Sequence, residues 1–413
     1  MIDLILTIIL ATILGTITGI LPGIHVNTVG LYVFSVSDTL LTYTNTTCLC
    51  TFFVTIAIVH AMLEFIPSLV IGVPDESTAL TVLPAHKLLF EGRAYEVIRI
   101  VAMAGFLSII IIILLMPVLA VLLPLLYNLI KPYVPYILII VILIMVFRFN
   151  NNIIGSVISL LIFLVSGIMG WLLLNSSMSS SSVLLCLLTG LFGTSSLIYS
   201  MLHEDNKIPK QEKSQGIIID KKFIKGVFAG SIAGCILGLL PGLGPAQGSV
   251  IAQSITGNDD IRPEDFLITN SGVNVSDTLF SLIAIYLIGN PRSSISVFIS
   301  YILYDMNIFH LMFLISVSLV SVSLGLIISL LIGDKIIEFI EKINYLYLSY
   351  IIIFLMSMVV LVYALFDGVP VGFMLLCYIT SVSLGLIPHF IGISKSNLMG
   401  VLILPSIIMF LGF

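Results

Sequence analysis

The stretch GTITGILPGIHVNTVG, residues 15–30, interrupts a long apolar run with a Pro-Gly pair. A second stretch, GCILGLLPGLGPAQGS at residues 234–249, repeats the pattern G-x-x-x-G-x-x-P-G, with all four fixed positions at one constant offset. Proline removes an amide donor and glycine permits tight backbone geometry, so each pair is expected to break a membrane helix. Two such breaks in corresponding places predict an internal duplication.

A second pair of motifs follows in the same order. IGVPDESTA at residues 71–79 resembles IGNPRSSIS at residues 288–296, at almost the same offset as the first pair. We therefore expect two transmembrane repeats, residues 1–202 and 226–413, and we expect them to be inverted. The linker at 203–225 is rich in lysine, so the positive-inside rule places it in the cytoplasm, together with the basic segment that contains Lys87, Arg93 and Arg99.

The composition fixes the class of protein. Of the 413 residues, 59% are hydrophobic and only 9% are charged, and the mean hydropathy is +1.23. Soluble domains carry about 25% charged residues, so a soluble enzyme, a nucleic-acid binder and a disordered chain are excluded. A spanning helix needs roughly 20 apolar residues, which allows about 10 to 13 membrane segments. The apolar runs are continuous and not alternating, so we predict an all-α, multi-pass protein of the cell membrane.

Two further expectations concern the N-terminus and the cysteines. No Lys or Arg precedes the first apolar stretch, so this stretch is expected to be a permanent membrane segment and not a signal peptide. The five cysteines all lie in apolar runs. They are expected to be buried thiols, with no disulfide framework and no metal site.

Paired helix breaks in the two halves of a membrane protein indicate a transport site at the repeat interface. Half-helix N-termini there present free N–H groups and positive dipole ends to an anion. Small polar side chains near the breaks are the usual donors for a carboxylate or phosphate. The candidate substrate-binding residues are Pro22, Gly23, His25, Asn27, Thr28, Pro74, Ser77, Thr78, Pro241, Gly242, Gln247, Ser249, Pro291, Arg292, Ser293 and Ser294. Gly15, Gly19, Gly234 and Gly238 are instead expected to allow close helix packing.

Three charged or titratable residues lie inside apolar segments. His60 and Glu64 are four residues apart and so share a helix face, and Asp277 aligns with His60 at the offset of the second motif. Such groups at membrane depth usually face a cavity or a partner. We expect this triad to couple transport to H⁺ or Na⁺; the alternative is a structural hydrogen-bonded pair that bridges helices. His86 is expected to lie in a polar loop.

These motifs resemble the large permease subunit of the tripartite tricarboxylate transporter family, the TctA family, also called DUF112. Its halves each carry the G-x-x-x-G-x-x-P-G signature and a later I-P-G-[ST] tip. The resemblance extends to PAH at 84–86 and EGRA at 91–94 in the first half, and to P-E-x-F at 263–266 and GV at 272–273 in the second. It covers roughly residues 10–105 and 226–300. It implies two partners, a small membrane subunit and an extracytoplasmic solute-binding protein.

This sequence departs from the family pattern in places that matter for the substrate. Charges, Asp75 and Arg292, replace both tip glycines. The family's acidic-then-Asn-Asn element survives only as Asp277, with Leu279 and Phe280 where polar groups are expected. The two tip charges could pair with each other, Arg292 could bind the anion, or both could be solvated.

The favoured function is secondary transport of an organic anion, a carboxylate, by alternating access with ion coupling. The alternative is a translocase or carrier for a polyprenyl-phosphate or a similar anionic lipid, whose tail Leu279 and Phe280 would suit. A membrane-embedded enzyme acting on lipids is a third interpretation. The sequence has no G-x-S-x-G elbow and no Walker A motif, so catalysis and ATP hydrolysis are not expected, and no cofactor is implied.

Overall fold

The computed structural model describes residues 2–411 except 22–25, 73–76, 79, 149–152, 204–207, 214–215, 239–243, 257–261, 341 and 343–344. The regular structure within these residues is helical throughout. Nine helices of the described part are long and apolar enough to cross a membrane. The prediction of an all-α, multi-pass membrane protein is therefore confirmed. The five cysteines are buried and free, as expected.

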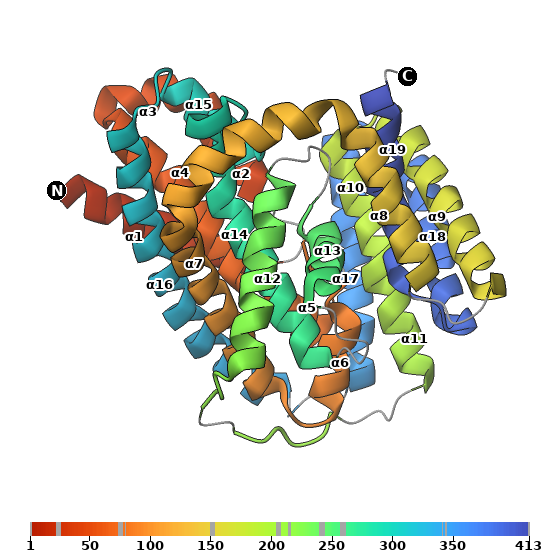
Figure 1. Ribbon diagram of the computed structural model, residues 1–413. Helices are drawn as coiled ribbons and strands as arrows, with labels where there is room; N and C mark the ends of the chain where they lie inside the picture. Colours follow the sequence, from red (N-terminus) through yellow and green to blue (C-terminus); the bar gives the residue numbers. More distant parts are fainter. Residues whose placement is uncertain are drawn as a thin grey trace.

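The first half of the chain begins with a long helix and ends with two short helices joined by a π-helical turn. Its elements are α1 (Ile2–Ile20), α2 (Val26–Ser35), α3 (Ser37–Tyr43), α4 (Thr46–Leu63), α5 (Phe65–Ile71), α6 (Val82–Phe90), α7 (Ala94–Ile130), η1 (Lys131–Tyr133), α8 (Val134–Arg148), α9 (Ile153–Leu174), α10 (Ser180–Leu188), η2 (Thr189–Thr194) and α11 (Ser195–His203). Pro117 and Pro124 lie inside α7, which is the long helix that arches over the top of Figure 1.

The second half begins at the end of the lysine-rich linker. Its elements are α12 (Lys221–Leu237), α13 (Pro245–Thr256), α14 (Pro263–Ile288), α15 (Ser294–Ile302), α16 (Ile308–Ile340), α17 (Tyr345–Phe366), α18 (Val371–Ile391), η3 (Lys395–Met399) and α19 (Gly400–Leu411).

The helix boundaries of the two halves recur at the offsets of the sequence motifs. The starts of α12 and α13 follow those of α1 and α2 at the offset of the first motif pair, and the start of α14 follows that of α4 at the offset of the second. Gly72 ends α5 with φ of +67° and Gly289 ends α14 with φ of +64°. Both occupy the left-handed region that favours glycine. The two halves thus place helices, breaks and helix ends in the same order.

Helices α4 and α16 run in the same direction. Ser321 of α16 donates to Thr55 Oγ1 of α4 (3.0 Å), and Ser329 donates to the carbonyl of Met62 (3.1 Å). The contacts advance toward the C-terminus of both helices, so α4 and α16 are parallel.

Helices α7 and α14 also run together, but against α4 and α16. Arg93, next to the N-terminus of α7, pairs with Glu264 in the first turn of α14 (2.5 Å). Arg99, early in α7, bonds Asp334, late in α16 (2.9 Å). Because α14 corresponds to α4 and α16 to α7, corresponding helices of the two halves run in opposite directions.

The halves exchange packing partners. Helix α1 packs along α4 and α12 along α14, while α4 contacts α16 and α14 contacts α7. A Cβ on Gly19 would lie 2.9 Å from Leu63 Cβ, and one on Gly234 would lie 3.0 Å from the amide nitrogen of Asp277. Cβ atoms on Gly15 and Gly238 would also collide with the adjacent helix. The prediction that these four glycines serve close packing is confirmed.

Two large hydrophobic cores divide the helices into two bodies. The first body contains α1–α7, α12 and α14–α16, and α13 packs against α12 and α14. The second contains α8–α10, η2 and α17–α19, and α11 packs against α18. Figure 1 shows the first body on the left and the second on the right. Each body therefore takes helices from both halves, and the sequence repeats do not coincide with the packing units.

A buried basic cluster lies where the two bodies meet. His86 on α6 is buried beside Gly72, and the Nζ of buried Lys395 on η3 donates to Ser196 Oγ on α11 (2.6 Å). Burial lowers the pKa of His86 to about 4, and the Lys395 ammonium contributes to this lowering. The expectation that His86 lies in a polar loop is wrong, because α6 forms a short helix that packs its imidazole inward.

The two basic segments meet at one end of the molecule, here called the basic end (residues 208–225 and the turn between α6 and α7). Buried Gln211 donates to the carbonyl of Leu89 (2.9 Å) and accepts from the amide of Ala94 (2.9 Å). The amide of Glu212 donates to the carbonyl of Gly92 (2.8 Å). The linker is thus bound to the first half, and both basic segments lie on one side, as the sequence predicts.

Candidate functional site

The residues that follow each of the two helix breaks line one cavity. Helix α1 ends at Ile20 and α2 begins at Val26, while α12 ends at Leu237 and α13 begins at Pro245. The residues of the breaks themselves lie outside the described residues, as does the tip of the first half: Pro22, Gly23, His25, Pro74, Asp75, Pro241 and Gly242. The first residues of α2 and α13 line the cavity from opposite halves of the chain.

The cavity has a volume of about 230 Å³ and receives side chains from both repeats. The first half contributes Val26, Asn27, Ala57, His60, Ala61, Glu64 and Ser77; the second contributes Gly244, Pro245, Asn274, Asp277, Thr278, Ser281, Arg292, Ser293 and Ile295. The lining combines carboxylates, one guanidinium, amides and hydroxyls. It can therefore hold a small ligand that carries charge.

Glu64 is a buried carboxylate of the lining that binds groups from both halves. It follows the last residue of α4. Ser77 donates to Glu64 Oε1 (2.6 Å), and the amide of Asn274 donates to the same oxygen. His60 Nε2 lies 3.2 Å from Oε2, one helical turn away. The carboxylate thus joins α14 of the second half to Ser77 and to α4 of the first half.

His60 is fixed by a second contact on its other nitrogen. Its Nδ1 lies 3.1 Å from the hydroxyl of Thr18 on α1, which is buried. Thr18 also donates to the carbonyl of Gly15 (3.1 Å), so its lone pairs face the imidazole. This arrangement favours a proton on Nδ1 and leaves Nε2 directed at Glu64 as an acceptor or, when protonated, as a donor.

Asn270 and Asn274 on α14 bind groups of the first half at the site. Neither residue is predicted from the sequence motifs. Asn270 Nδ2 donates to the carbonyl of Ser77 (3.1 Å) and to Ser249 Oγ (2.6 Å). Asn274 Nδ2 also donates to the carbonyl of Ala61 (3.2 Å). Each asparagine on α14 therefore binds the backbone of the first half, and Asn270 also joins α14 to α13.

Asp277 lies on the same face of α14 as Asn274, three residues away, and lines the cavity. It aligns with His60, and Ser281 aligns with Glu64 at the same offset. All four line the cavity. The equivalent positions of the two halves thus differ in chemistry, with imidazole and carboxylate in one half and carboxylate and hydroxyl in the other. The structure brings the three predicted coupling residues, His60, Glu64 and Asp277, to one cavity.

Arg292 lies at the tip of the second half, between α14 and α15 and outside the membrane-spanning helices. Its guanidinium lines the cavity and lies 5.7 Å from the ring centre of Tyr127 on α7. Burial lowers the pKa of Arg292, whereas Tyr127 and Asp277 raise it. Ser293 and Ser296 form a capping box that fixes the start of α15. This cap holds the tip in place, so the guanidinium is positioned at the cavity.

The other predicted binding residues divide into three groups. Thr78 is buried and accepts from Ser68 on α5 (2.7 Å), so its hydroxyl binds the protein interior and does not line the cavity. Pro291 is half-buried, and Ser294 is exposed at the start of α15. Thr28 and Gln247 lie in α2 and α13, with side chains outside the described part.

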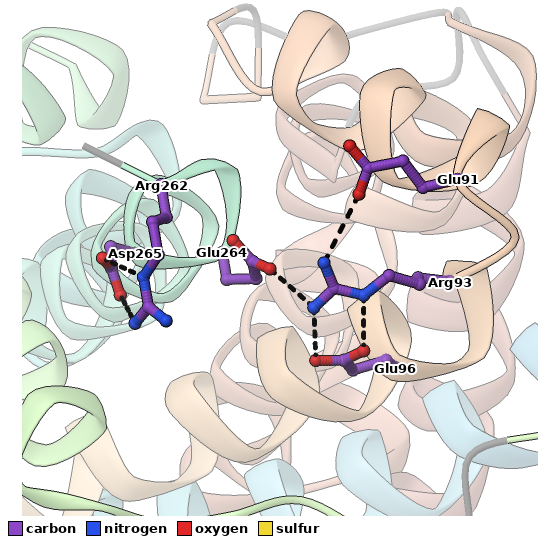
Figure 2. A network of polar contacts seen from close by, with 6 residues as sticks. All are labelled: Glu91, Arg93, Glu96, Arg262, Glu264 and Asp265. Carbon is purple, nitrogen blue, oxygen red and sulfur yellow. Dashed lines mark hydrogen bonds and ion pairs between the residues drawn. The ribbon is translucent and has the colours of Figure 1, made fainter. Parts of the chain in front are cut away.

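Two sequence motifs from opposite halves meet at the basic end. Arg93 donates two hydrogen bonds to Glu96 (2.9 Å each) and also contacts Glu91 and Glu264, as Figure 2 shows. Glu91 and Arg93 belong to the EGRA stretch and Glu264 to the P-E-x-F element. The side chain of Arg93 is 34% exposed, so this network is a surface contact that aligns the start of α7 with the start of α14.

The family model of the tripartite tricarboxylate transporter TctA family matches residues 5–400. The chain belongs to the TctA family. The uncharacterized protein MJ1079 of Methanocaldococcus jannaschii is 33% identical over 389 residues, which is 94% of each chain. No solved structure matches this chain. The resemblance inferred from the sequence motifs is therefore confirmed.

Membership of the TctA family makes the chain a component of a tricarboxylate-type transporter. Tripartite transporters of this family work with other subunits and a binding protein. Of the departures of this TctA chain, Arg292, Asp277, Leu279 and Phe280 lie in the described part, and Asp75 lies outside it. Leu279 and Phe280 are fully buried, and Phe280 packs against Gly238. Neither lines the cavity, so the suggestion that they suit a lipid tail loses its support.

Proposed function

We propose that the chain is the large permease subunit of an organic-anion transporter, and that the cavity between the two halves binds a di- or tricarboxylate. The observation that carries this proposal is the meeting of Arg292 with amide and hydroxyl groups from both halves around one cavity. A planar guanidinium binds a carboxylate through two parallel hydrogen bonds. The first turns of α2 and α13 line the cavity, so the positive ends of both helix dipoles lie beside the anion.

The acidic groups of the cavity supply a reason for ion coupling. Glu64 and Asp277 line the same space as Arg292. An anionic substrate would be repelled by two carboxylates at low dielectric. A proton or Na⁺ bound at Glu64 and Asp277 removes this repulsion, and His60 can hold a proton beside Glu64. Cation and anion would therefore raise each other's affinity, which is the thermodynamic requirement for coupled transport.

The antiparallel halves provide a route to alternating access. Equivalent helices run in opposite directions and exchange packing partners across the cavity. A conformation open to one side of the membrane thus has a counterpart, open to the other side, in which the halves swap their local arrangements. We expect a small membrane subunit and an extracytoplasmic solute-binding protein to complete the transporter, as in the TctA family.

Ligand-dependent thermal stability of the purified chain tests this proposal. A ligand at 100 times its Kd stabilises the folded state by about 2.7 kcal/mol. Citrate should raise the Tm, acetate should raise it less, and the effect of citrate should grow with Na⁺ or with acidification. In Glu64→Gln the cation dependence should disappear. Stabilisation by a polyprenyl phosphate and not by citrate would favour a lipid carrier and contradict the proposal.

A further inference from the structure

A second cavity lies among α12, α13 and α14, at the basic end and apart from the site described above. Its volume is about 170 Å³. Lys222 and Lys225 line it from α12, Gln253 and Thr256 from α13, and Thr269 from α14. The spacing of three residues within each of the first two pairs puts both members on one helix face.

One lining residue lacks a partner for its donor. Gln253 is 5% exposed, and its Nε2 makes no hydrogen bond within the described part of the chain. A buried amide donor without a hydrogen-bond partner costs free energy. A ligand oxygen atom in the cavity would accept this hydrogen bond and remove the cost. Lys225 Nζ donates to the carbonyl of Thr256 (2.8 Å), which leaves two of its three N–H groups for a ligand.

Among the residues that the structure describes, the lining of this cavity carries a net positive charge. Asp265 also lines it, but Arg262 holds that carboxylate with two hydrogen bonds of 2.9 and 3.0 Å, as seen in Figure 2. The negative charge is thus already matched, and Lys222 and Lys225 remain. Two ammonium groups and an amide around a space of this size suit a phosphate or another compact oxyanion.

The two helices that line the cavity also carry exposed apolar side chains on their neighbouring faces. Ile224 and Phe228, on α12, are 52% and 46% exposed, and Ile255, on α13, is 46% exposed. A free anion would gain nothing from these side chains, whereas acyl chains would cover them. We propose that this cavity binds the phosphate of an anionic phospholipid, whose acyl chains lie against these exposed apolar residues. The lipid is a ligand of the basic end and not the transported substrate.

Native mass spectrometry of the purified chain with phosphatidylglycerol, phosphatidylcholine or inorganic phosphate tests this assignment. The double variant Lys222→Gln/Lys225→Gln should lose about tenfold or more in phosphatidylglycerol affinity, given the usual contribution of each basic residue at a membrane surface. Gln253→Met should lose severalfold. The matched control is Lys221→Gln, which changes the adjacent exposed lysine of α12 and should bind like the wild type.

Three outcomes would overturn the proposal. The first is phosphatidylglycerol binding by the double variant that equals that of Lys221→Gln. The second is binding of phosphatidylcholine as tight as that of phosphatidylglycerol, which would remove the role of charge. The third is inorganic phosphate that binds as tightly as the lipid, which would leave a free-phosphate site and no role for the apolar surface.

Discussion

The side-chain amide of Asn274 on α14 donates a hydrogen bond to the carboxylate of Glu64, which follows α4. A residue of the second half therefore binds a buried acid of the first half, at the cavity that both halves line. The same amide donates to the carbonyl of Ala61 (3.2 Å). Any movement of α14 against α4 must change the surroundings of Glu64, which links helix position to the charge state of the site.

Asn274→Ala should destabilise the protein because it removes a donor from a buried carboxylate. The expected loss is about 1 to 3 kcal/mol. The measurement is a double-mutant cycle with Glu64→Gln, read from thermal or denaturant unfolding in detergent. The two changes should couple by about 1 kcal/mol or more, since they touch one bond. Asn175→Ala, in an exposed turn, is the control. Strictly additive effects at Asn274 and Glu64 would show that the bond contributes nothing.

Arg292→Gln should abolish stabilisation by citrate while leaving the apo protein folded. The reason is that the guanidinium is the one cation among the described residues lining the cavity that keeps its charge at every working pH. Arg292→Lys should retain partial binding, because an ammonium lacks the planar fork. The measurement is citrate affinity by calorimetry. Lys335→Gln, an exposed site on α16, should bind normally. Normal affinity in Arg292→Gln would remove Arg292 from the site.

Much of the fold could be predicted because its determinants are local. Long apolar runs predicted the membrane-spanning helices, and the Pro-Gly pairs predicted where α1 and α12 end. The spacing of His60 and Glu64 placed them on one helix face, and they lie 3.2 Å apart. Asn270 and Asn274 were missed, although α14 is the least apolar of the nine candidate membrane spans in the described part. That excess of polar residues was the available signal.

The division into two bodies could not be predicted in the same way. Apolar residues at a helix surface show that the helix packs, but not against which partner. Here α4 contacts α16 and α9 contacts α19, so each half packs with the other. The burial of His86 was hidden for a similar reason. It depends on Gly72 and η3, which are far apart in the sequence.

Gly234→Ala should destabilise the protein through the contact between α12 and α14. A Cβ at this position would lie 3.0 Å from the amide nitrogen of Asp277 and from the carbonyl oxygen of Val273. Overpacking of this kind costs about 1 to 3 kcal/mol. Gly372→Ala, on α18, meets no atom within 4 Å and should be neutral. Thermal unfolding of both variants checks the contrast, and equal Tm values would contradict such close packing.

His86→Gln should flatten the loss of stability in acid. The pKa of His86 is lowered from 6.5 to about 4 by burial and by Lys395, so the folded state favours the neutral imidazole. This contribution is complete above pH 6.5 and falls as the pH drops toward 4, by about 3 kcal/mol in all. The measurement is Tm against pH for wild type and variant. The difference between the two Tm curves separates the contribution of His86 from those of the other titratable groups. If the two curves are parallel, His86 is not buried in its neutral form.

The location of the substrate can be tested by cysteine protection. Thr278 lines the cavity, and Thr278→Cys should react with a water-soluble thiol reagent, against the low background of five buried native cysteines. Citrate should slow this reaction severalfold and leave Ser177→Cys, at an exposed site between α9 and α10, unaffected. If citrate binds the protein and yet the labelling of Thr278→Cys is unchanged, the anion does not occupy the cavity between the two halves.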